Sequence, residues 1–254
     1  MAMSGTWIEL TAENLEQEHL CCAIGDKKHQ AGVAAKRDWL RQRLPEGHVF
    51  RKLDAQGKVF IEYAPLETAF VPVTGSGYLY IYCLWVAGAF KGQGYGRALL
   101  EHCLADARAQ GKAGVCVLSA KKKKPYLSEK KFLQQFGFET VDASGDYELL
   151  ALPLGGGPRP CFTESAKRQT IPGQELTVYY SPQCPYLRNC VEQVRTYCEA
   201  EQIPLRLEAV ERVEQAKALP CVFNNWATFY GGRLVGLQPL NENALKKLLA
   251  QVQG

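Results

Sequence analysis

The sequence predicts an α/β (α+β) protein of two domains, the larger one first. The chain has 254 residues, which is long for one compact domain and comfortable for two. Residues 152–173 contain three consecutive glycines and four prolines, a composition typical of a connecting segment. On both sides of this stretch, runs of β-branched and aromatic residues alternate with helical patterns. We therefore expect domains at 1–152 and 174–254, joined by a Gly/Pro-rich linker at 153–173.

Composition narrows the class of protein. Hydrophobic residues make up 46% of the chain and charged residues 22%, as in ordinary globular proteins. The net charge of +4 is too small to favour nucleic acid, and no apolar run of about 18 residues predicts a membrane span. The N-terminus "MAMSGTWIEL" lacks a signal-peptide pattern. Most of the ten cysteines lie in apolar runs, which favours reduced thiols and a cytoplasmic protein with no nucleic-acid or membrane partner.

The elements of the first domain follow from hydrophobic periodicity. Strands are expected at 49–54, 58–64, 78–86, 114–120 and 147–152. Helices are expected at 13–24, 30–43, 95–110 and 128–136. The first two strands bracket the short turn "AQG" and so predict a hairpin. The helix at 95–110 is the most strongly indicated, because its apolar residues recur at spacings of three and four. Ser128 is the expected N-cap of the last helix.

The second domain has the order β-α-β-α-β-β-α. Its elements are expected at 176–181, 185–201, 205–210, 211–218 and 227–237, with a final helix from Asn241. The run 227–237 is a hairpin that turns at Gly231 and Gly232. Strand–helix alternation followed by a hairpin and a closing helix predicts a small α/β sandwich.

The segment "KGQGYG", residues 91–96, joins an expected strand to an expected helix. Backbone N–H groups converge at a helix N-terminus and favour an anion, most often phosphate, and glycine lets the backbone approach it closely. The segment is not a P-loop, because Gly96 is followed by Arg97 and Ala98. It is not a dinucleotide-binding fingerprint either, because the third glycine of that motif is absent. From these residues alone, an ordinary glycine-containing loop remains the alternative.

This segment resembles the Arg/Gln-x-x-Gly-x-Gly/Ala loop of the GNAT acetyltransferases, with Lys91 where that family usually has Arg or Gln. The flanking runs "LWVAGAF", "GVCVLSA" and "FLQQFGFETV" fit the same family over roughly residues 5–152. The stretches "EHLCCAIGDKKHQAGVAAKRDWL" and "GKVFIEYAP" further resemble the GNAT proteins that carry a C-terminal YoaP-type domain. The resemblance implies a mixed-sheet acetyltransferase domain that uses acetyl-coenzyme A as acyl donor. It implies that the cofactor-binding residues are Leu84, Trp85, Val86, Lys91, Gly92, Gln93, Gly94, Tyr95, Gly96 and Ser119.

The implied reaction is N-acetylation of a small-molecule or peptide amine by direct attack on the thioester. Glu62, in an otherwise apolar strand, is the candidate general base, since burial would raise its pKa toward neutrality. The alternative is an exposed glutamate on a hairpin edge. Many members of the family have a tyrosine as general acid where this chain has Leu133. Tyr126, Ser128 or a cysteine could replace it, or the thiolate leaves unassisted.

Two further clusters have structural and functional interpretations. "SAKKKKPYLSEKKF", residues 119–132, is either a solvated loop or a basic segment that attracts anionic coenzyme A or an acidic acceptor. His19 with Cys21 and Cys22 could face the substrate or a soft metal, but adjacent cysteines point in different directions on a helix. Packed thiols are favoured there, and no metal site is expected.

The segment "YYSPQCPYLRNC", residues 179–190, resembles the active-site segment of glutaredoxins and implies a thioredoxin-like fold. Cys184 would lie at a helix N-terminus, where the helix dipole favours the thiolate. Leu187 replaces the second cysteine of dithiol enzymes, and Cys190 lies nearly two helical turns away, so dithiol chemistry is not expected. Besides acetyl transfer, two functions remain: a thiol-redox protein acting through Cys184, and a non-catalytic acyl-coenzyme A-binding module.

Overall fold

The computed structural model describes residues 5–20, 23 and 25–253. It divides into two compact units. The first consists of residues up to 24, 40–69 and 73–162, and the second of residues 25–39, 70–72 and 163–254. The second unit therefore includes two short segments from the N-terminal half of the chain. None of the helices among the described residues is both long and apolar enough to cross a bilayer.

The first unit is built on a seven-stranded sheet in the order β1-β2-β3-β5-β6-β8-β7. The strands are β1 (Trp7–Glu9), β2 (Val49–Leu53), β3 (Val59–Pro65), β5 (Tyr78–Val86), β6 (Gly114–Ala120), β7 (Glu139–Ser144) and β8 (Tyr147–Pro153). Only β5 and β6 are parallel, and all other neighbours are antiparallel, so the sheet is mixed. This confirms the hairpin predicted from "AQG" and the strands expected from the sequence.

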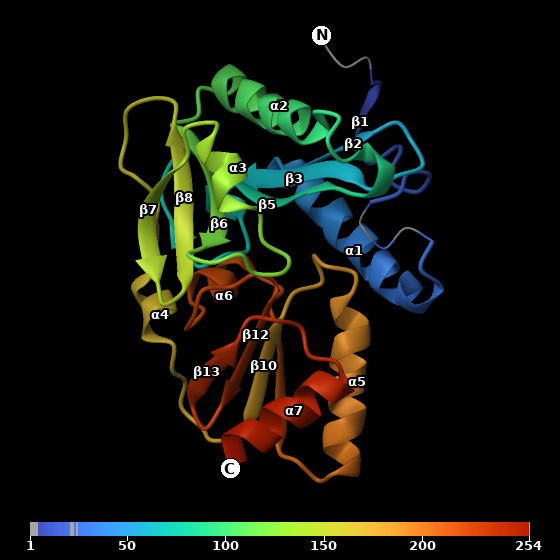
Figure 1. Ribbon diagram of the computed structural model, residues 1–254, viewed down its shortest axis with the longest axis vertical. Coiled ribbons are helices and arrows are strands. Elements are labelled where there is room, and N and C mark those ends of the chain that lie inside the picture. Colours follow the sequence, from blue (N-terminus) through green and yellow to red (C-terminus); the bar gives the residue numbers. More distant parts are fainter. Residues whose placement is uncertain (1–4, 21–22, 24, 254) are drawn as a thin grey trace. The chain divides into compact units, whose positions relative to one another are not determined.

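Helix α2 (Tyr95–Ala109) lies along one face of this sheet, and the short α3 (Lys130–Gln134) lies on the same side (Figure 1). The buried stripe of α2 consists of Leu99, Leu100, Cys103, Leu104 and Ala107, as its periodicity predicts. It packs against alternate residues of the strands, including Ile61, Tyr63 and Ile81. Because side chains alternate along a strand, the residues between these face the other side of the sheet.

Several smaller elements complete the first half of the chain and the connection between the units. The helices are η1 (Lys27–His29), α1 (Gln30–Arg43), η2 (Leu44–Glu46), η3 (Leu66–Thr68), η4 (Gly88–Phe90) and α4 (Glu164–Arg168). The two-residue strands β4 (Val73–Thr74) and β9 (Cys161–Phe162) pair antiparallel. The helix expected at 30–43 is confirmed.

Two local expectations were wrong. Residues 13–20 form turns rather than a helix, and the Asn14 side chain closes one by accepting from Thr11 N and donating to Glu9 O. Ser128 does not cap α3, whose N-cap is Glu129. The Gly/Pro-rich segment contains α4, because residues 164–168 include neither glycine nor proline and the Thr163 hydroxyl caps that helix.

The second unit has a four-stranded sheet in the order β11-β10-β12-β13. Its elements are β10 (Leu176–Tyr180), α5 (Leu187–Ala200), β11 (Leu205–Ala209), α6 (Val213–Lys217), β12 (Trp226–Tyr230), β13 (Arg233–Gly236) and α7 (Glu242–Gln253). Strands β10 and β11 are parallel, and the other pairs are antiparallel. The predicted element order is confirmed. Helices α5 and α7 contribute to the core of this unit, in which Trp226 is fully buried.

Gly32 on α1 is required by close packing within the second unit. A Cβ at this position would lie 1.8 Å from the carbonyl oxygen of Pro185, a backbone atom that cannot rotate away. We expect Gly32→Ala to destabilise the protein by about 1–3 kcal/mol, as overpacking does. Gly155→Ala, which meets nothing within 4 Å, is the control. Urea unfolding measures both, and equal stabilities of the two variants would contradict the assignment.

Candidate active site

The parallel strands β5 and β6 separate toward their C-terminal ends. Their pairing runs from Tyr78 opposite Gly114 to Ile81 opposite Val117, although β5 continues to Val86 and β6 to Ala120. Past Ile81, no described strand pairs with this edge of β5. The backbone groups along Leu84, Trp85 and Val86 that point to this side are therefore available to a ligand. This open edge includes Leu84, Trp85 and Val86, which the sequence resemblance implied as cofactor-binding residues.

A bulge in β5 accompanies this separation. Glu62 pairs with Cys83, but the next residue of β3, Tyr63, pairs with Ile81, so Tyr82 is an extra residue in β5. Bulges re-aim side chains and increase strand twist. Here the extra residue lies at the level where β5 leaves β6.

The glycine loop follows β5 and leads into α2. Gly92 and Gly94 have φ values of 76° and 84°, a region that glycine enters without the steric cost of a Cβ. Gly94 is the N-cap and provides no side-chain hydrogen bond, and the first helical bond runs from Ala98 N to Gly94 O. The N–H groups of the first helical turn thus have no partner within the helix. A Cβ at Gly92 would meet nothing within 4 Å, so there is space in front of the loop.

Aromatic side chains support this loop. Phe90 packs edge-on against Tyr95 at 5.8 Å between ring centroids, and Tyr95 packs against Trp7 at 6.2 Å. The Gln93 side chain folds back and donates to the carbonyl of Ala89. The loop is therefore held in shape before any ligand binds.

Phe132 on α3 forms a wall beside the loop and was not among the predicted site residues. A Cβ built on Gly96 would lie 3.6 Å from the Phe132 ring and 3.9 Å from Leu84, so α2, α3 and β5 meet there. Phe132 also contacts Phe136, whose ring lies under the Arg97 guanidinium at 4.8 Å. The i, i+4 spacing of the two phenylalanines in "FLQQFGF" is the signal that could have placed both on one face.

Glu62 is fully buried, so its interpretation as an exposed edge residue is wrong. Its carboxylate lies 3.0 Å from Nε2 of His48, which is also buried. The His48 ring lies 5.3 Å from that of Tyr82, the bulged residue. Since Ile61 and Tyr63 face α2, Glu62 faces the opposite side of the sheet. Cys83 and Trp85 are two residues apart on β5 and face this same side, where Trp85 is 40% exposed.

The candidate general acids occupy different environments. Leu133 is buried in the core and provides no proton. Tyr126 is 67% exposed on the loop after β6, with a backbone φ of 65°. The backbone carbonyl of Ser128 accepts from the hydroxyl of Ser119, which is buried at the end of β6. Among the cysteines, Cys83 is partly exposed on β5.

Among the described residues, His19 is not part of a metal site. Cys21 and Cys22 lie outside the described residues. Burial and the nearby Lys52 ammonium lower the pKa of His19 to about 4, so the ring is neutral near pH 7. Within residues 5–20, 23 and 25–253, no group of three His, Cys, Asp or Glu side chains is placed to hold a metal ion.

Cys184 precedes α5 rather than beginning it. The helix starts at Leu187, whose N–H donates to the Cys184 carbonyl at 3.2 Å. Leu187 itself is buried in the core of the second unit, and burial raises the pKa of the Cys190 thiol. The segment therefore presents no second activated thiol in the helix.

The open edge of β5, followed by a glycine loop at a helix N-terminus, fits an acyltransferase, and the comparison of sequences agrees. The chain matches the Acetyltransferase (GNAT) family over residues 12–138 and the YoaP-like family over residues 204–247. The chain belongs to the GNAT acetyltransferase family. It is an acyltransferase, and acetyl-coenzyme A is its acyl donor.

One relative matches the chain along almost all of its length. The uncharacterized N-acetyltransferase YoaP of Bacillus subtilis (strain 168) is 36% identical over 245 residues, which cover 96% of this chain and 98% of the relative. The two proteins therefore share both regions and their order.

Solved structures of GNAT proteins are similar at a lower level. A GNAT acetyltransferase from Brucella melitensis in complex with acetyl-CoA is 17% identical, with a TM-score of 0.38, and covers 61% of this chain and 90% of its own. PaiA N-acetyltransferase from Thermoplasma acidophilum in complex with coenzyme A is 15% identical, with a TM-score of 0.42, and covers 59% and 99%.

Proposed function

We propose that the protein is an N-acetyltransferase that transfers the acetyl group to an amine of a small molecule or peptide by direct attack. The observation that carries this proposal is the open edge of β5, which lies between the glycine loop on the α2 side and the buried Glu62–His48 pair on the other side. Donor and acceptor can then approach one strand from opposite faces of the sheet.

The residues on the α2 side fit the acyl donor. The first-turn N–H groups of α2 and the backbone of residues 91–96 bind the pyrophosphate, and the positive end of the helix dipole adds to the attraction. The unpaired backbone along Leu84–Val86 binds the pantetheine arm, and an N–H there polarises the thioester carbonyl as an oxyanion-hole donor does. Acetyl-coenzyme A supplies the activated acetyl group.

The residues on the opposite face handle the proton. Glu62 has no exposed surface and His48 is almost fully buried, so neither side chain contacts the amine directly and the proton reaches the Glu62–His48 pair through a water. The amine nitrogen forms the new C–N bond as the C–S bond breaks, and the thiolate takes up a proton. Tyr126 and Ser128 remain candidates for its donor, and departure of the thiolate without one is the alternative.

Turnover with a panel of amines tests the proposal. The protein is incubated with acetyl-coenzyme A and amino acids, polyamines or short peptides, and the release of free coenzyme A thiol is followed together with the mass of the acetylated product. We expect acetylation of at least one amine class. Tight binding of acetyl-coenzyme A without acetylation of any amine would instead support a non-catalytic binding module.

The thiol-redox alternative makes a different prediction. Cys184 lies outside the helix, and Leu187 occupies the position of a resolving thiol. We therefore expect Cys184→Ser to retain acetyl transfer within about twofold. Cys198→Ser, at a buried cysteine of α5, is the matched control for effects on packing. Loss of acetyl transfer in Cys184→Ser alone, with a glutathione-dependent reductase activity in the wild type, would show that this thiol takes part.

A further inference from the structure

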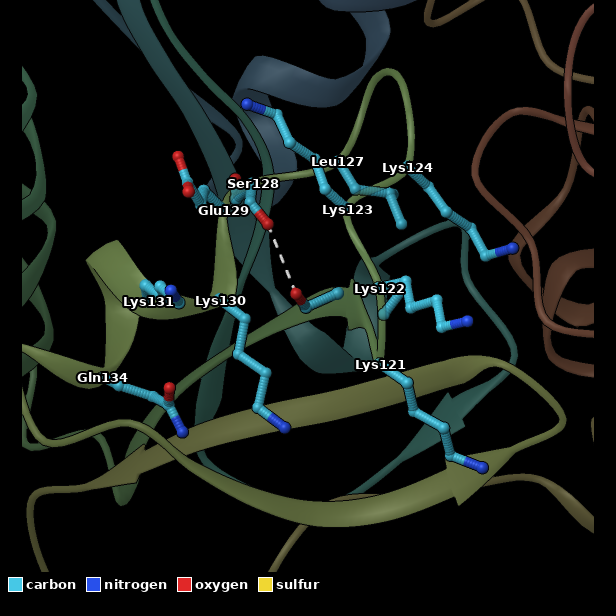
Figure 2. Close-up of a pocket in the computed structure, with 12 residues that line it drawn as sticks. Lys121, Lys122, Lys123, Lys124, Leu127, Ser128, Glu129, Lys130, Lys131 and Gln134 are labelled. Atoms are coloured by element: carbon cyan, nitrogen blue, oxygen red, sulfur yellow. Dashed lines mark hydrogen bonds between the residues drawn. The ribbon is translucent and has the colours of Figure 1, made fainter.

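A cavity of about 390 Å³ lies beside the end of β6. It is lined by Ser119 and Ala120 of the strand, by the following loop, and by α3 (Figure 2). Its lining includes six lysines, Lys121, Lys122, Lys123, Lys124, Lys130 and Lys131, and a single acidic residue, Glu129. Ser119 and Ala120 come after the last pairing of β6 with β5, so the cavity lies at the end of β6 that has separated from β5.

The positive charge of this lysine pocket is only partly balanced. Lys124 pairs with Asp146 at 3.0 Å, and Lys130 pairs with Glu148 at 2.7 Å. Lys124 is joined by Lys121 and Lys122 in lowering the pKa of the Asp146 carboxyl. In the part of the chain that the structure describes, no ion pair engages Lys121, Lys122 or Lys123. Lysines that outnumber the acidic groups around one cavity attract an anion.

The lysine pocket is separate from the glycine loop. Lys130 and Gln134 line it from one face of α3, whereas Phe132 on the opposite face of the same helix meets Gly96. An anion in the lysine pocket is therefore not the pyrophosphate at the N-terminus of α2. It is a second negatively charged group, held on the other side of α3.

The loop around the lysine pocket has a strained conformation. Tyr126 has a φ of 65°, in the left-handed region that residues with a Cβ rarely adopt. Such strain persists where the surrounding structure fixes it, and it gathers at ligand sites. The turn at Tyr126 brings Leu127 and Ser128 back to the lysines of the same loop, and Ser128 is tied to Ser119 at 3.2 Å.

We propose that the lysine pocket is a second anion subsite of the acetyltransferase, which binds a phosphate or carboxylate group of a substrate bound at the open edge of β5. This inference rests on the proposed function. Two sources carry such a group: the 3′-phosphate of coenzyme A, and an acidic group on the acceptor. The pocket therefore selects a substrate by a charge distant from the reacting atoms.

The test uses the full chain and three ligands. The variant Lys121→Gln/Lys122→Gln/Lys123→Gln is compared with wild type and with Lys27→Gln/Lys28→Gln/Lys247→Gln, which removes three exposed lysines outside the pocket. Calorimetry measures the binding of acetyl-coenzyme A, of its 3′-dephospho form, and of inorganic phosphate added to protein saturated with acetyl-coenzyme A.

The outcomes distinguish the two sources. If the pocket variant binds acetyl-coenzyme A at least tenfold more weakly but binds the dephospho form as wild type does, the pocket holds the 3′-phosphate. If acetyl-coenzyme A binding is unchanged and only the pocket variant loses inorganic phosphate, the pocket serves the acceptor. Equal affinities in all three proteins, or equal losses in both variants, would overturn the proposal. A wild type that binds no acetyl-coenzyme A would contradict the proposed function, and phosphate titration of the free protein would still test the pocket.

Discussion

Glu62→Gln is expected to lower kcat for acetyl transfer by about 10²–10⁴-fold, the range that a general base contributes. The substitution keeps the shape of the side chain and removes the carboxylate that lies 3.0 Å from His48. The buried pair then loses the group proposed to accept the proton. The proposed site for acetyl-coenzyme A lies on the other face of the sheet, so the affinity for this cofactor is expected to stay within about twofold of wild type. Stopped assays of product formation and calorimetric titration measure the two quantities.

A matched variant separates this effect from loss of stability. Lys52 is buried on the same face as Glu62 and pairs with Glu18 at 2.6 Å. Glu18→Gln therefore removes a carboxylate from a buried cation without touching the proposed proton path. We expect it to lower the stability of the protein but to keep the decrease of kcat/KM at low pH, which arises because the base takes up a proton. Glu62→Gln should lose that decrease. The same pH profile in both variants would show that Glu62 has only a structural role.

The pairing of His48 with Glu62 could have been predicted in part from the sequence. The predicted hairpin pairs residue 49 with residue 63, so residues 48 and 62 lie diagonally on one face, within reach of each other. The turn "AQG" therefore predicts the pairing register of the hairpin and the face that residues 48 and 62 share. The sequence did not show that Glu62 is buried, because β3 becomes a central strand between β2 and β5 only once the whole sheet is formed.

The open edge of β5 depends on contacts distant in sequence. Residues 91–96 were recognised from local pattern, since glycine requirements and helix starts are local properties. The separation of β5 from β6 and the bulge at Tyr82 are not local properties. They depend on the pairing of β5 with β3 and of β6 with β8. The helix expected at 13–24 was wrong for a related reason. Its apolar residues Leu15 and Leu20 are buried, but from turns and irregular backbone rather than from a helix.

Gly94→Glu is expected to weaken the binding of acetyl-coenzyme A at least 100-fold. Gly94 is the N-cap of α2, and a carboxylate there would accept from the free N–H groups of the first turn and stabilise the positive end of the helix. The new side chain would thus occupy the position proposed for the pyrophosphate while the helix stays folded. A micromolar wild-type affinity corresponds to about −8 kcal/mol, and a 100-fold loss to about 2.7 kcal/mol. Calorimetric titration measures both.

Strain at a positive φ must be separated from loss of the anion site. Gly111, just beyond the C-terminal end of α2, has a φ of 61° and open space around its Cα, so Gly111→Glu introduces the same side chain and a similar strain far from the glycine loop. Gly94→Asn keeps the left-handed conformation at small cost and adds no charge. We expect Gly111→Glu to bind as wild type does and Gly94→Asn to lose less affinity than Gly94→Glu. If Gly94→Glu binds as tightly as Gly111→Glu, the pyrophosphate lies elsewhere and the glycines of residues 91–96 serve only the turn.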